Sequence, residues 1–503
     1  MRPALDAHYG IPQETRLLFA ALVMLPHVEL TGLLQMSQKI TRGGVLSGQI
    51  LTDAERVHRF ARTAVSIKGN TATEWKLGVA EWVQGLLHGW GLHWRALSRS
   101  ALSLKNFETE LFQDFIWQHL FARSVPPAQR QAVLRANYRV CFTPWRWMHQ
   151  VGITYASLLR RARYPQLATE HTDILIAQTP YPGRVSSGTT LVIHYHDAIP
   201  VLMPHTISDS AFHQASHFHA LSANVRNGAY FVCVSEATRQ DLIHLFPQVE
   251  TRTVTIHNMV PEHYHAGAPE PKRLPGIVRR HLHGTFHPSK PQFDSRSYPL
   301  ERSFRSEEEK ADFYAQAFSP CTRYLLMVST LEPRKNHARL IEAWEALRDQ
   351  VDPDLKLVFV GHIGWDYKNI LNACLPWAEQ GSLFMLHNVP PHALRVLYQQ
   401  ALVTVCPSVG EGFDFSGVEA MRCGGVVAAS DIPVHREVYG EAATYFDPYD
   451  TSDAVAALRA LISGPNAQAK RDVLRAAGAE QSSRYLPERI LPQWEKFLTG
   501  LRQ

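Results

Sequence analysis

Two glutamates, Glu411 and Glu419, share the short segment Glu-Gly-Phe-Asp-Phe-Ser-Gly-Val-Glu, which offers polar groups of two kinds. The apolar run at 401–406 predicts a strand before them, and we expect a helix to begin near Ser416. Glu411 would then lie just beyond the carboxyl end of a strand, where open α/β sheets bind ligands. The free amides of the helix start suit a phosphate or a sugar oxygen. Carboxylate acceptors and N–H donors together match the chemistry of a sugar nucleotide.

A pair of adjacent cations, Arg334 and Lys335, follows a second predicted strand at 324–329. Pro333 fixes the turn between this strand and the cations. Parallel strands end at the same edge of a sheet, so this loop is expected to converge with the glutamate loop. A leaving diphosphate gains negative charge as its bond to a sugar breaks, and fixed cations stabilise that transition state more than the ground state. The alternative is a solvated cationic pair before a helix; the neighbouring glutamate loop favours the functional interpretation.

A third loop, around Val389, follows a predicted strand at 383–386 and is expected to bring backbone groups near a nucleobase.

For the glutamates, the alternative is an exposed loop carboxylate and a helix-start carboxylate that the helix dipole stabilises. The surrounding residues, Gly412 and Phe413 above all, make the functional interpretation more specific.

Bulk composition describes an ordinary globular protein. The chain has 503 residues, 45% of them hydrophobic, and a net charge of +5, which allows two or three domains and predicts no nucleic-acid partner. Six scattered cysteines without a CxxC pair favour a reduced, cytoplasmic compartment. His194-x-His196 is a weak metal spacing, and no metal or cofactor is expected. No signal peptide is visible, and residues 16–34 predict a buried helix that stops near Pro26 rather than a membrane span.

The positioning elements predict two Rossmann-like domains. In the first, residues 1–315, a strand at 2–7, a loop at Gly10 and a helix open the chain, and strands at 173–177, 190–194 and 230–234 follow. The second domain, 316–485, carries the strands at 324–329, 356–360, 383–386, 401–406 and 425–429. A proline-rich stretch at about 265–318 predicts a linker or excursion of the first domain. A C-terminal helix, 486–503, is expected to pack back on the first domain.

Residues from about 45 to 165 are helix-rich and hold seven of the eleven tryptophans. The plain interpretation is an inserted helical subdomain with aromatic core positions. A second interpretation is a surface for lipid or a lipid-linked acceptor, because some of these tryptophans alternate with cations in a way that suits an interface helix. The residues concerned are Trp82, Trp90, Trp94, Lys76, Arg95 and Arg99.

Residues 324–448 resemble the C-terminal domain of family 4 glycosyltransferases, which are retaining enzymes of the GT-B fold. The resemblance is carried by Val-Ser-Thr-Leu-Glu-Pro-Arg-Lys-Asn at 328–336, Leu-Val-Phe-Val-Gly at 357–361, the glutamate segment through Glu-Ala-Met at 419–421, Gly-Gly-Val-Val-Ala at 424–428 and Phe-Asp-Pro at 446–448. It extends to 194–200 and 234–239, covers roughly two thirds of the chain, and leaves out about 45–165 and 265–318. It implies an α/β fold of two Rossmann-like domains facing across a cleft.

The resemblance implies a role for each matching residue. Glu411 would contact hydroxyls of the donor sugar, Glu419 the ribose and Lys335 the phosphates. His196 would lie beside the reacting sugar, and Gly10 where the N-terminal loop meets the diphosphate. With Arg334, these residues form the expected catalytic and donor-binding set, which is completed by Gly412, Phe413, Ser416, Gly417 and Val389, with Asp197, Asp414 and Thr330 as further candidates.

Two positions depart from the family pattern. Many members carry Gly-Arg where this chain has Ser329 and Thr330, so Arg334 is expected to supply the missing cation. Many also have Gly-Leu-Pro after Glu-Gly-Phe, where this chain has Asp-Phe-Ser. Ser416 can still cap the helix there. Asp414 could reach the donor or the acceptor, or could be a turn residue.

The expected activity is a metal-independent, retaining transfer of a hexose from a sugar nucleotide to a glycan or lipid-linked acceptor. The Glu-Pro-Arg-Lys-Asn loop resembles the branch of bacterial mannosyl- and rhamnosyltransferases of surface-polysaccharide synthesis, which makes GDP-mannose the first donor to consider. Peripheral contact with the inner face of the plasma membrane is a further expectation. The alternatives are a phosphorylase or sugar-nucleotide epimerase of the same fold and a catalytically silent sugar-binding subunit. A dinucleotide oxidoreductase is disfavoured, since no GxGxxG follows the first strand.

Overall fold

The chain divides into two compact units. The computed structural model describes residues 10–68, 75–98, 100–282 and 306–501, and at 75–86, 307 and 310 it describes the backbone alone. The N-terminal unit comprises residues 1–204, 209–261 and 487–503, and the C-terminal unit comprises 205–208 and 262–486. Each is an α/β unit with parallel strands, in agreement with the expectation of two Rossmann-like domains.

The C-terminal unit is built on one parallel sheet of six strands in the order β12-β11-β10-β13-β14-β15. In chain order, the strands are β10 (Tyr324–Val328), β11 (Lys356–Val360), β12 (Leu383–Leu386), β13 (Val403–Cys406), β14 (Val427–Ser430) and β15 (Ala443–Phe446). The chain lays down three strands in one direction and then returns to the middle, so β10 and β13 are adjacent although they are separated in sequence. This reversal is the topological switch point, where doubly wound sheets bind ligands.

Helices alternate with these strands, as the sequence predicts, and are α13 (His337–Gln350), α14 (Lys368–Glu379), α15 (Pro391–Gln400), α16 (Phe415–Arg422), α17 (Pro433–Tyr439), α18 (Thr451–Ile462) and α19 (Ala467–Ser483). The central strands are buried on both faces because helices cover both sides of the sheet. Five of the six strands were expected. The exception is β15, whose four residues, Ala-Thr-Tyr-Phe, give too short and mixed a pattern.

The described residues of the stretch at about 265–318 fall in the C-terminal unit, which begins earlier than the expected boundary at 315–316. Two helices, α11 (Leu274–His281) and α12 (Glu307–Ala317), form within it. Leu282 makes a β-bridge to Leu386 in β12, and the buried ring of Phe318 packs on that of Phe384 with centroids 5.1 Å apart. This apolar contact attaches the segment to the six-stranded sheet of the C-terminal unit.

The N-terminal unit has a parallel sheet in the order β6 (Ile174–Ala177), β7 (Thr190–Tyr195), β8 (Tyr230–Cys233) and β9 (Thr253–Thr255). A second, three-stranded sheet pairs β1 (Thr31–Leu34) with β4 (Asn137–Cys141), and β4 with β3 (Leu104–Phe107). Two short strands, β2 (Ala101–Leu102) and β5 (Gln166–Leu167), pair separately. The first strand expected at 2–7 lies outside the described residues.

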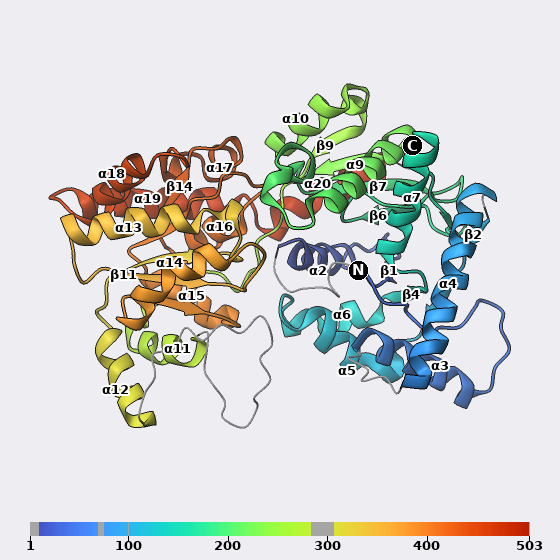
Figure 1. Cartoon of the computed structure of the whole chain (residues 1–503), viewed down its shortest axis with the longest axis horizontal. Helices are drawn as coiled ribbons and strands as arrows, with labels where there is room; N and C mark the ends of the chain where they lie inside the picture. The colour runs from blue at the N-terminus through green and yellow to red at the C-terminus, as the bar shows by residue number, and fades with distance from the viewer. Residues whose placement is uncertain (1–9, 69–74, 99, 283–305, 502–503) are drawn as a thin grey trace. The chain divides into compact units, whose positions relative to one another are not determined.

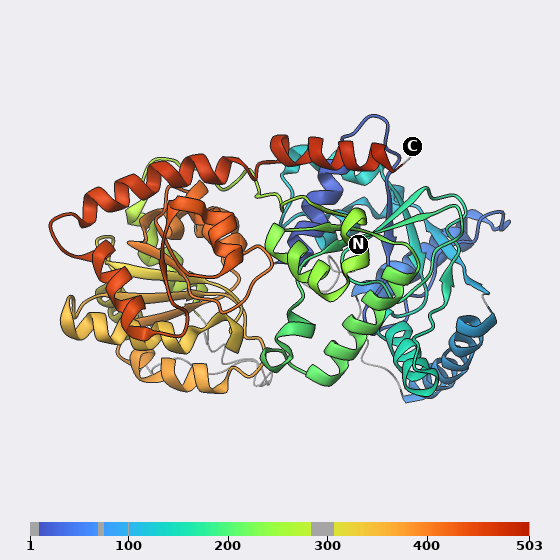
Figure 2. The ribbon, with the colours of Figure 1, turned by 90° about the horizontal axis from the view of Figure 1, so that it is seen from above.

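Two helices from opposite ends of the chain share one core in this unit. Helix α2 (Ile11–Leu22) ends before Pro26, and α20 (Pro487–Gly500) lies along the same unit (Figure 2). Trp494 is fully buried in an apolar cluster with Leu17 and Leu18 of α2 and with Val192 and Val232 of the sheet. Within the described parts of the chain, no helix has the length and apolar character needed to cross a bilayer.

The tryptophan-rich segment contains more than helices. It forms α3 (Asp53–Lys68), α4 (Trp75–Ser98), α5 (Gln113–Ile116), α6 (Arg130–Arg135) and α7 (Trp145–Leu159), but it also supplies β3 and β4. Its core is shared rather than separate, because Phe60, Phe121 and Tyr138 pack with Phe19 of α2 and Leu34 of β1. The segment is helix-rich, as expected, but two of its strands, β3 and β4, extend a sheet that begins outside it with β1.

Candidate functional site

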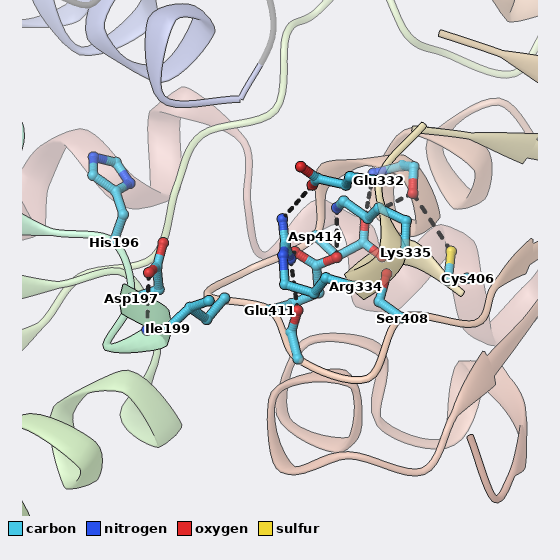
Figure 3. Close-up of polar contacts among 12 residues, drawn as sticks. His196, Asp197, Ile199, Glu332, Arg334, Lys335, Cys406, Ser408, Glu411 and Asp414 are labelled. Atoms are coloured by element: carbon cyan, nitrogen blue, oxygen red, sulfur yellow. Dashed lines mark hydrogen bonds and ion pairs between the residues drawn. The ribbon is translucent and has the colours of Figure 1, made fainter. Parts of the chain in front are cut away.

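The loops after β10 and β13 meet at the switch point of the C-terminal unit. The first loop carries Arg334 and Lys335, and the second carries Glu411 (Figure 3). Asn336, with φ at 63°, donates from its amide to the carbonyls of Pro407 (3.1 Å) and Pro448 (2.9 Å). Asparagine tolerates this left-handed conformation better than most residues. One side chain thus fastens together the loops that follow β10, β13 and β15.

Glu411 is held by both predicted cations. Arg334 Nη1 donates to Glu411 Oε2 at 2.8 Å, and Lys335 Nζ donates to Oε1 of the same carboxylate. All three side chains are largely buried, Glu411 with only 7% exposure. Burial by itself would raise the pKa of Glu411, but the charges of Arg334 and Lys335 outweigh it and hold this pKa below its ordinary value. At neutral pH Glu411 is therefore an ionised acceptor and not a general acid.

A second carboxylate, Glu332, also fixes Arg334. Arg334 Nη2 donates to Glu332 Oε1 at 2.8 Å while its Nη1 also donates to the carbonyl of Gly410 at 2.6 Å. Burial raises the pKa of Glu332 although Arg334 opposes the shift. Sequence reasoning missed this residue, because only its place two positions before Arg334 hinted at a partner. Glu332 and Glu411 therefore hold the guanidinium of Arg334 from two sides.

Asp414 caps α16, a role that we expected of Ser416. Its Oδ1 accepts from the backbone N of Ser416 at 3.1 Å and from the Ser416 hydroxyl at 2.6 Å. The backbone of Asp414 has φ 58°, which a short polar side chain tolerates. Burial would raise the pKa of Asp414, but hydrogen bonding from His435 and Ser416 and the charge of Lys335 lower it. Asp414, whose role the sequence left open, is thus an ionised helix cap.

His435, which the sequence did not single out, is the remote partner of Asp414. Its Nε2 lies 3.2 Å from Asp414 Oδ2, and its Nδ1 lies 3.0 Å from the carbonyl oxygen of Ser430. The Ser430 hydroxyl, also 3.0 Å from Nδ1, donates to the carbonyl of Ser408. Both ring nitrogens of His435 therefore lie within hydrogen-bond distance of oxygen atoms. This buried series of hydrogen bonds connects α17 to the glutamate loop.

The other residues of the glutamate segment divide into polar and packing roles. Glu419 is 5% exposed and accepts from the hydroxyl of Tyr398 at 3.0 Å. The ring of Phe413 packs on those of Phe415 and Tyr485, with centroids 5.3 and 5.2 Å away. A Cβ on Gly417 would approach the ring of Tyr439 to 2.3 Å, so a glycine is needed where α16 meets α17. Phe413 and Gly417 therefore support the loop, and only their backbones are candidates for ligand contact.

Three more expected residues lie on loops of the same edge. Thr330 is half-buried after β10, where Gly361 comes so close that a Cβ there would lie 1.9 Å from the carbonyl oxygen of Ser329. Val389 follows β12 with its side chain 3% exposed, so only its backbone is available to a nucleobase. Gly412 lies between Glu411 and Phe413.

The N-terminal unit holds the remaining three candidates, and its polar groups are of another kind. His194 Nδ1 and His196 Nε2 both contact Oε1 of Gln178, at 3.0 and 3.3 Å. Burial lowers the pKa of His196 to about 3, so its ring is neutral. Asp197 Oδ1 accepts from the N–H of Ile199 at 3.1 Å, at the start of the short helix α8 (Ile199–Leu202) (Figure 3). Gly10, with φ 64°, precedes α2.

Two family models match the chain and together span more than half of it. The model described as Glycosyltransferase Family 4 matches residues 110–264, and the model described as Glycosyl transferases group 1 matches residues 309–481. The second match contains the whole switch-point network from Arg334 to His435. The first match begins at 110, inside the segment that we expected the family resemblance to leave out.

Among curated proteins, the chain is 31% identical over 176 residues to O-antigen chain mannosyltransferase B of Escherichia coli, covering 35% of this chain and 44% of that protein. It is 23% identical over 233 residues to O-antigen chain mannosyltransferase RfbU of Salmonella typhimurium, covering 44% of this chain and 64% of that protein. The matched region spans less than half the length of the Escherichia coli relative.

Among solved structures, the chain resembles that of Alr3699/HepE of Anabaena in complex with UDP and glucose. The TM-score is 0.50 at 16% identity, with 74% of this chain and 88% of that chain covered. At this identity the likeness concerns the fold, which is that of GT-B.

Proposed function

The chain belongs to the family 4 glycosyltransferases, and we propose that it transfers a hexose from a sugar nucleotide to a glycan or lipid-linked acceptor in bacterial polysaccharide synthesis. GDP-mannose is the proposed donor. The similarity to O-antigen mannosyltransferases of two bacteria supports this choice of sugar. We place the reaction at the cytoplasmic side of the plasma membrane as part of the same proposal.

The observation that carries the proposal is the ionic cluster at the switch point. Two cations, Arg334 and Lys335, are fixed next to an ionised carboxylate, Glu411, and all three are largely buried. Such preorganised cations stabilise charge that develops on a leaving diphosphate, and they do so more strongly in a site from which water is excluded. A binding module would have no need for cations that are held in place by two separate carboxylates.

In the proposed reaction, the bond between the anomeric carbon and the diphosphate oxygen breaks, and its electron pair leaves with the phosphate. The acceptor oxygen bonds to the same carbon on the same face, and its proton passes to the leaving phosphate oxygen. Arg334 and Lys335 stabilise the diphosphate. Glu411 accepts hydrogen bonds from sugar hydroxyls and orients the ring, a role that suits a carboxylate whose pKa is lowered.

Two further contacts belong to the proposal. Glu419, held by the hydroxyl of Tyr398, is assigned to the ribose hydroxyls of the nucleotide. His196 is assigned to the reacting sugar. As a neutral ring with a pKa near 3, it would contribute hydrogen bonds and not a positive charge, since the ring is uncharged at neutral pH.

Turnover of candidate donors with a mannose-terminated synthetic acceptor tests this function. GDP-mannose, UDP-glucose and UDP-N-acetylglucosamine are compared, and product is measured by mass spectrometry together with the anomeric configuration by NMR. We expect product of retained configuration from GDP-mannose alone. Breakdown of GDP-mannose that is independent of acceptor, or an inverted product, would contradict the proposal. Binding of GDP without turnover on any acceptor would favour a silent subunit.

A further inference from the structure

Helix α4 of the N-terminal unit has two apolar faces. Leu92 and Ala96 are 1% and 4% exposed and pack into the core of the unit. The opposite face leaves four large apolar side chains in solvent, which we call the α4 stripe: Leu87 (68% exposed), Trp90 (79%), Trp94 (70%) and Leu97 (46%). At 3.6 residues per turn these four positions fall within an arc of about 80°. A helix that only packed on its own unit would need the first face alone.

The neighbouring helix α7 adds exposed apolar residues. It packs against α4, where the Tyr155 hydroxyl donates to the carbonyl of His93 at 3.1 Å and the two rings meet edge to face. The last turn of α7 exposes Leu158 (72%) and Leu159 (50%). Single exposed apolar residues are ordinary, but a stripe with two tryptophans next to a further exposed pair marks an interaction surface.

The two segments that form this surface carry basic but no acidic side chains. No Asp or Glu occurs between residues 82 and 107 or between 115 and 169. Three arginines, Arg160, Arg161 and Arg163, are exposed directly after α7. Arg226 also lies near, because after burial the charge of Arg161 is the next cause that lowers the pKa of Arg226. Exposed arginines beside exposed tryptophans are complementary to an anionic surface.

We propose that the α4 stripe docks this chain on an anionic lipid bilayer, with α4 lying in the plane of the headgroups and the arginines after α7 contacting lipid phosphates. Tryptophan favours the boundary between headgroups and acyl chains, where its ring is buried and its N–H stays hydrated. The aromatic stripe and the exposed arginines together favour this occupant over a second copy of the chain, which would bring the arginines of two copies together.

This surface belongs to the N-terminal unit and shares no residue with the switch-point cluster of the C-terminal unit, so its test needs no turnover. The full chain is floated with vesicles of phosphatidylcholine alone and of phosphatidylcholine with phosphatidylglycerol. Wild type is compared with Trp90→Ser/Trp94→Ser and Arg161→Glu/Arg163→Glu. The control is Leu111→Ser, which removes an apolar side chain of the same unit with the 70% exposure of Trp94.

We expect wild type and Leu111→Ser to float with the anionic vesicles, and each double variant to partition about tenfold less. Thermal unfolding and GDP binding of the two double variants should match wild type, since their side chains are exposed. Equal flotation of wild type and Trp90→Ser/Trp94→Ser would overturn the proposal. Failure of wild type to float would also overturn it. If light scattering then showed that Trp90→Ser/Trp94→Ser converts a dimer to a monomer, the occupant of the stripe would be a second copy of the chain.

Discussion

The two units arrange their polar groups in opposite ways. In the C-terminal unit, one six-stranded parallel sheet brings charged side chains together at its switch point, where each is held by the others. In the N-terminal unit, the candidates around Gln178 are buried imidazoles that carry no charge at neutral pH. The comparison teaches that fixed charges gather in the C-terminal unit, while the N-terminal unit offers neutral hydrogen-bonding groups and an exposed apolar surface.

Removing the cations should have the largest effect. Arg334→Ala/Lys335→Ala is expected to lower kcat by about a thousandfold, about 4 kcal/mol of transition-state stabilisation, while the chain stays folded. Initial rates with saturating GDP-mannose measure it. The control is Arg436→Ala, which removes an exposed arginine paired with Asp431 in the same unit and should keep the wild-type rate. If kcat of the double variant stayed within tenfold of the wild-type value, the fixed charges of the C-terminal unit would have no special part in the reaction.

Breaking the buried pair behind the glutamate loop should cost stability. His435→Ala leaves Asp414 ionised and without its imidazole partner, and we expect a loss of about 3 kcal/mol in the free energy of unfolding. Adding Asp414→Gly should recover part of this loss, because glycine adopts the positive φ of this position and removes the unpaired charge. Urea unfolding of both variants measures the coupling. Strictly additive losses would mean that the two side chains do not act as a pair.

Acid should destabilise the N-terminal unit through its neutral histidines. The pKa of His196 is about 3 in the fold against an ordinary value of 6.5, so below pH 6.5 the unfolded chain binds a proton that the folded chain does not. Stability is complete above pH 6.5 and should fall by about 1.4 kcal/mol per pH unit for each such histidine as the pH drops toward 3. Urea titrations from pH 7 to 5 measure this slope.

His196→Gln sharpens that prediction, since its amide can still donate to Gln178 but cannot take up a proton. The variant should show a shallower decline with acid than wild type. Identical slopes would mean that His196 does not contribute to the pH dependence.

The exposed stripe should matter least to the fold. Trp90→Ser/Trp94→Ser is expected to change the free energy of unfolding by no more than about 0.5 kcal/mol, because both side chains already lie in solvent. Trp494→Ala, by contrast, removes a fully buried ring from the core between α2, α20 and the sheet and should cost about 3–5 kcal/mol. Urea unfolding distinguishes the two tryptophan environments. A large loss in the serine variant would mean that the stripe is part of the core.

Sequence patterns predicted most strands and motif loops of the C-terminal unit because the residues that signal each of them are contiguous in the sequence. Strands such as β10 and β11 are continuous apolar runs, and the loops that follow them carry the motif residues. His435 and Glu332 were missed because their roles depend on partners brought close only by the fold or by the orientation of a side chain. That Asp414, and not Ser416, caps α16 depends on a positive φ that no pattern signalled.

The N-terminal unit was harder to predict because its sheet partners are distant in sequence. The pairing of β1 with β4 joins residues more than one hundred positions apart, across a segment whose many tryptophans suggested helices. The core shared by Phe19, Leu34 and Tyr138 is likewise non-local. The sequence left open whether Trp90 and Trp94 lie in a core or on a lipid-facing surface, since an apolar helix face is compatible with both; their exposure decides between the two.

The affinity of GDP relative to GMP, measured by calorimetry in wild type and in Arg334→Ala/Lys335→Ala, tests most directly whether the paired cations hold the donor diphosphate. Wild type should bind GDP about a hundredfold more tightly than GMP, because only GDP carries the second phosphate to the cations. The variant should bind both with similar, weak affinity. An undiminished preference for GDP in the variant would contradict the account.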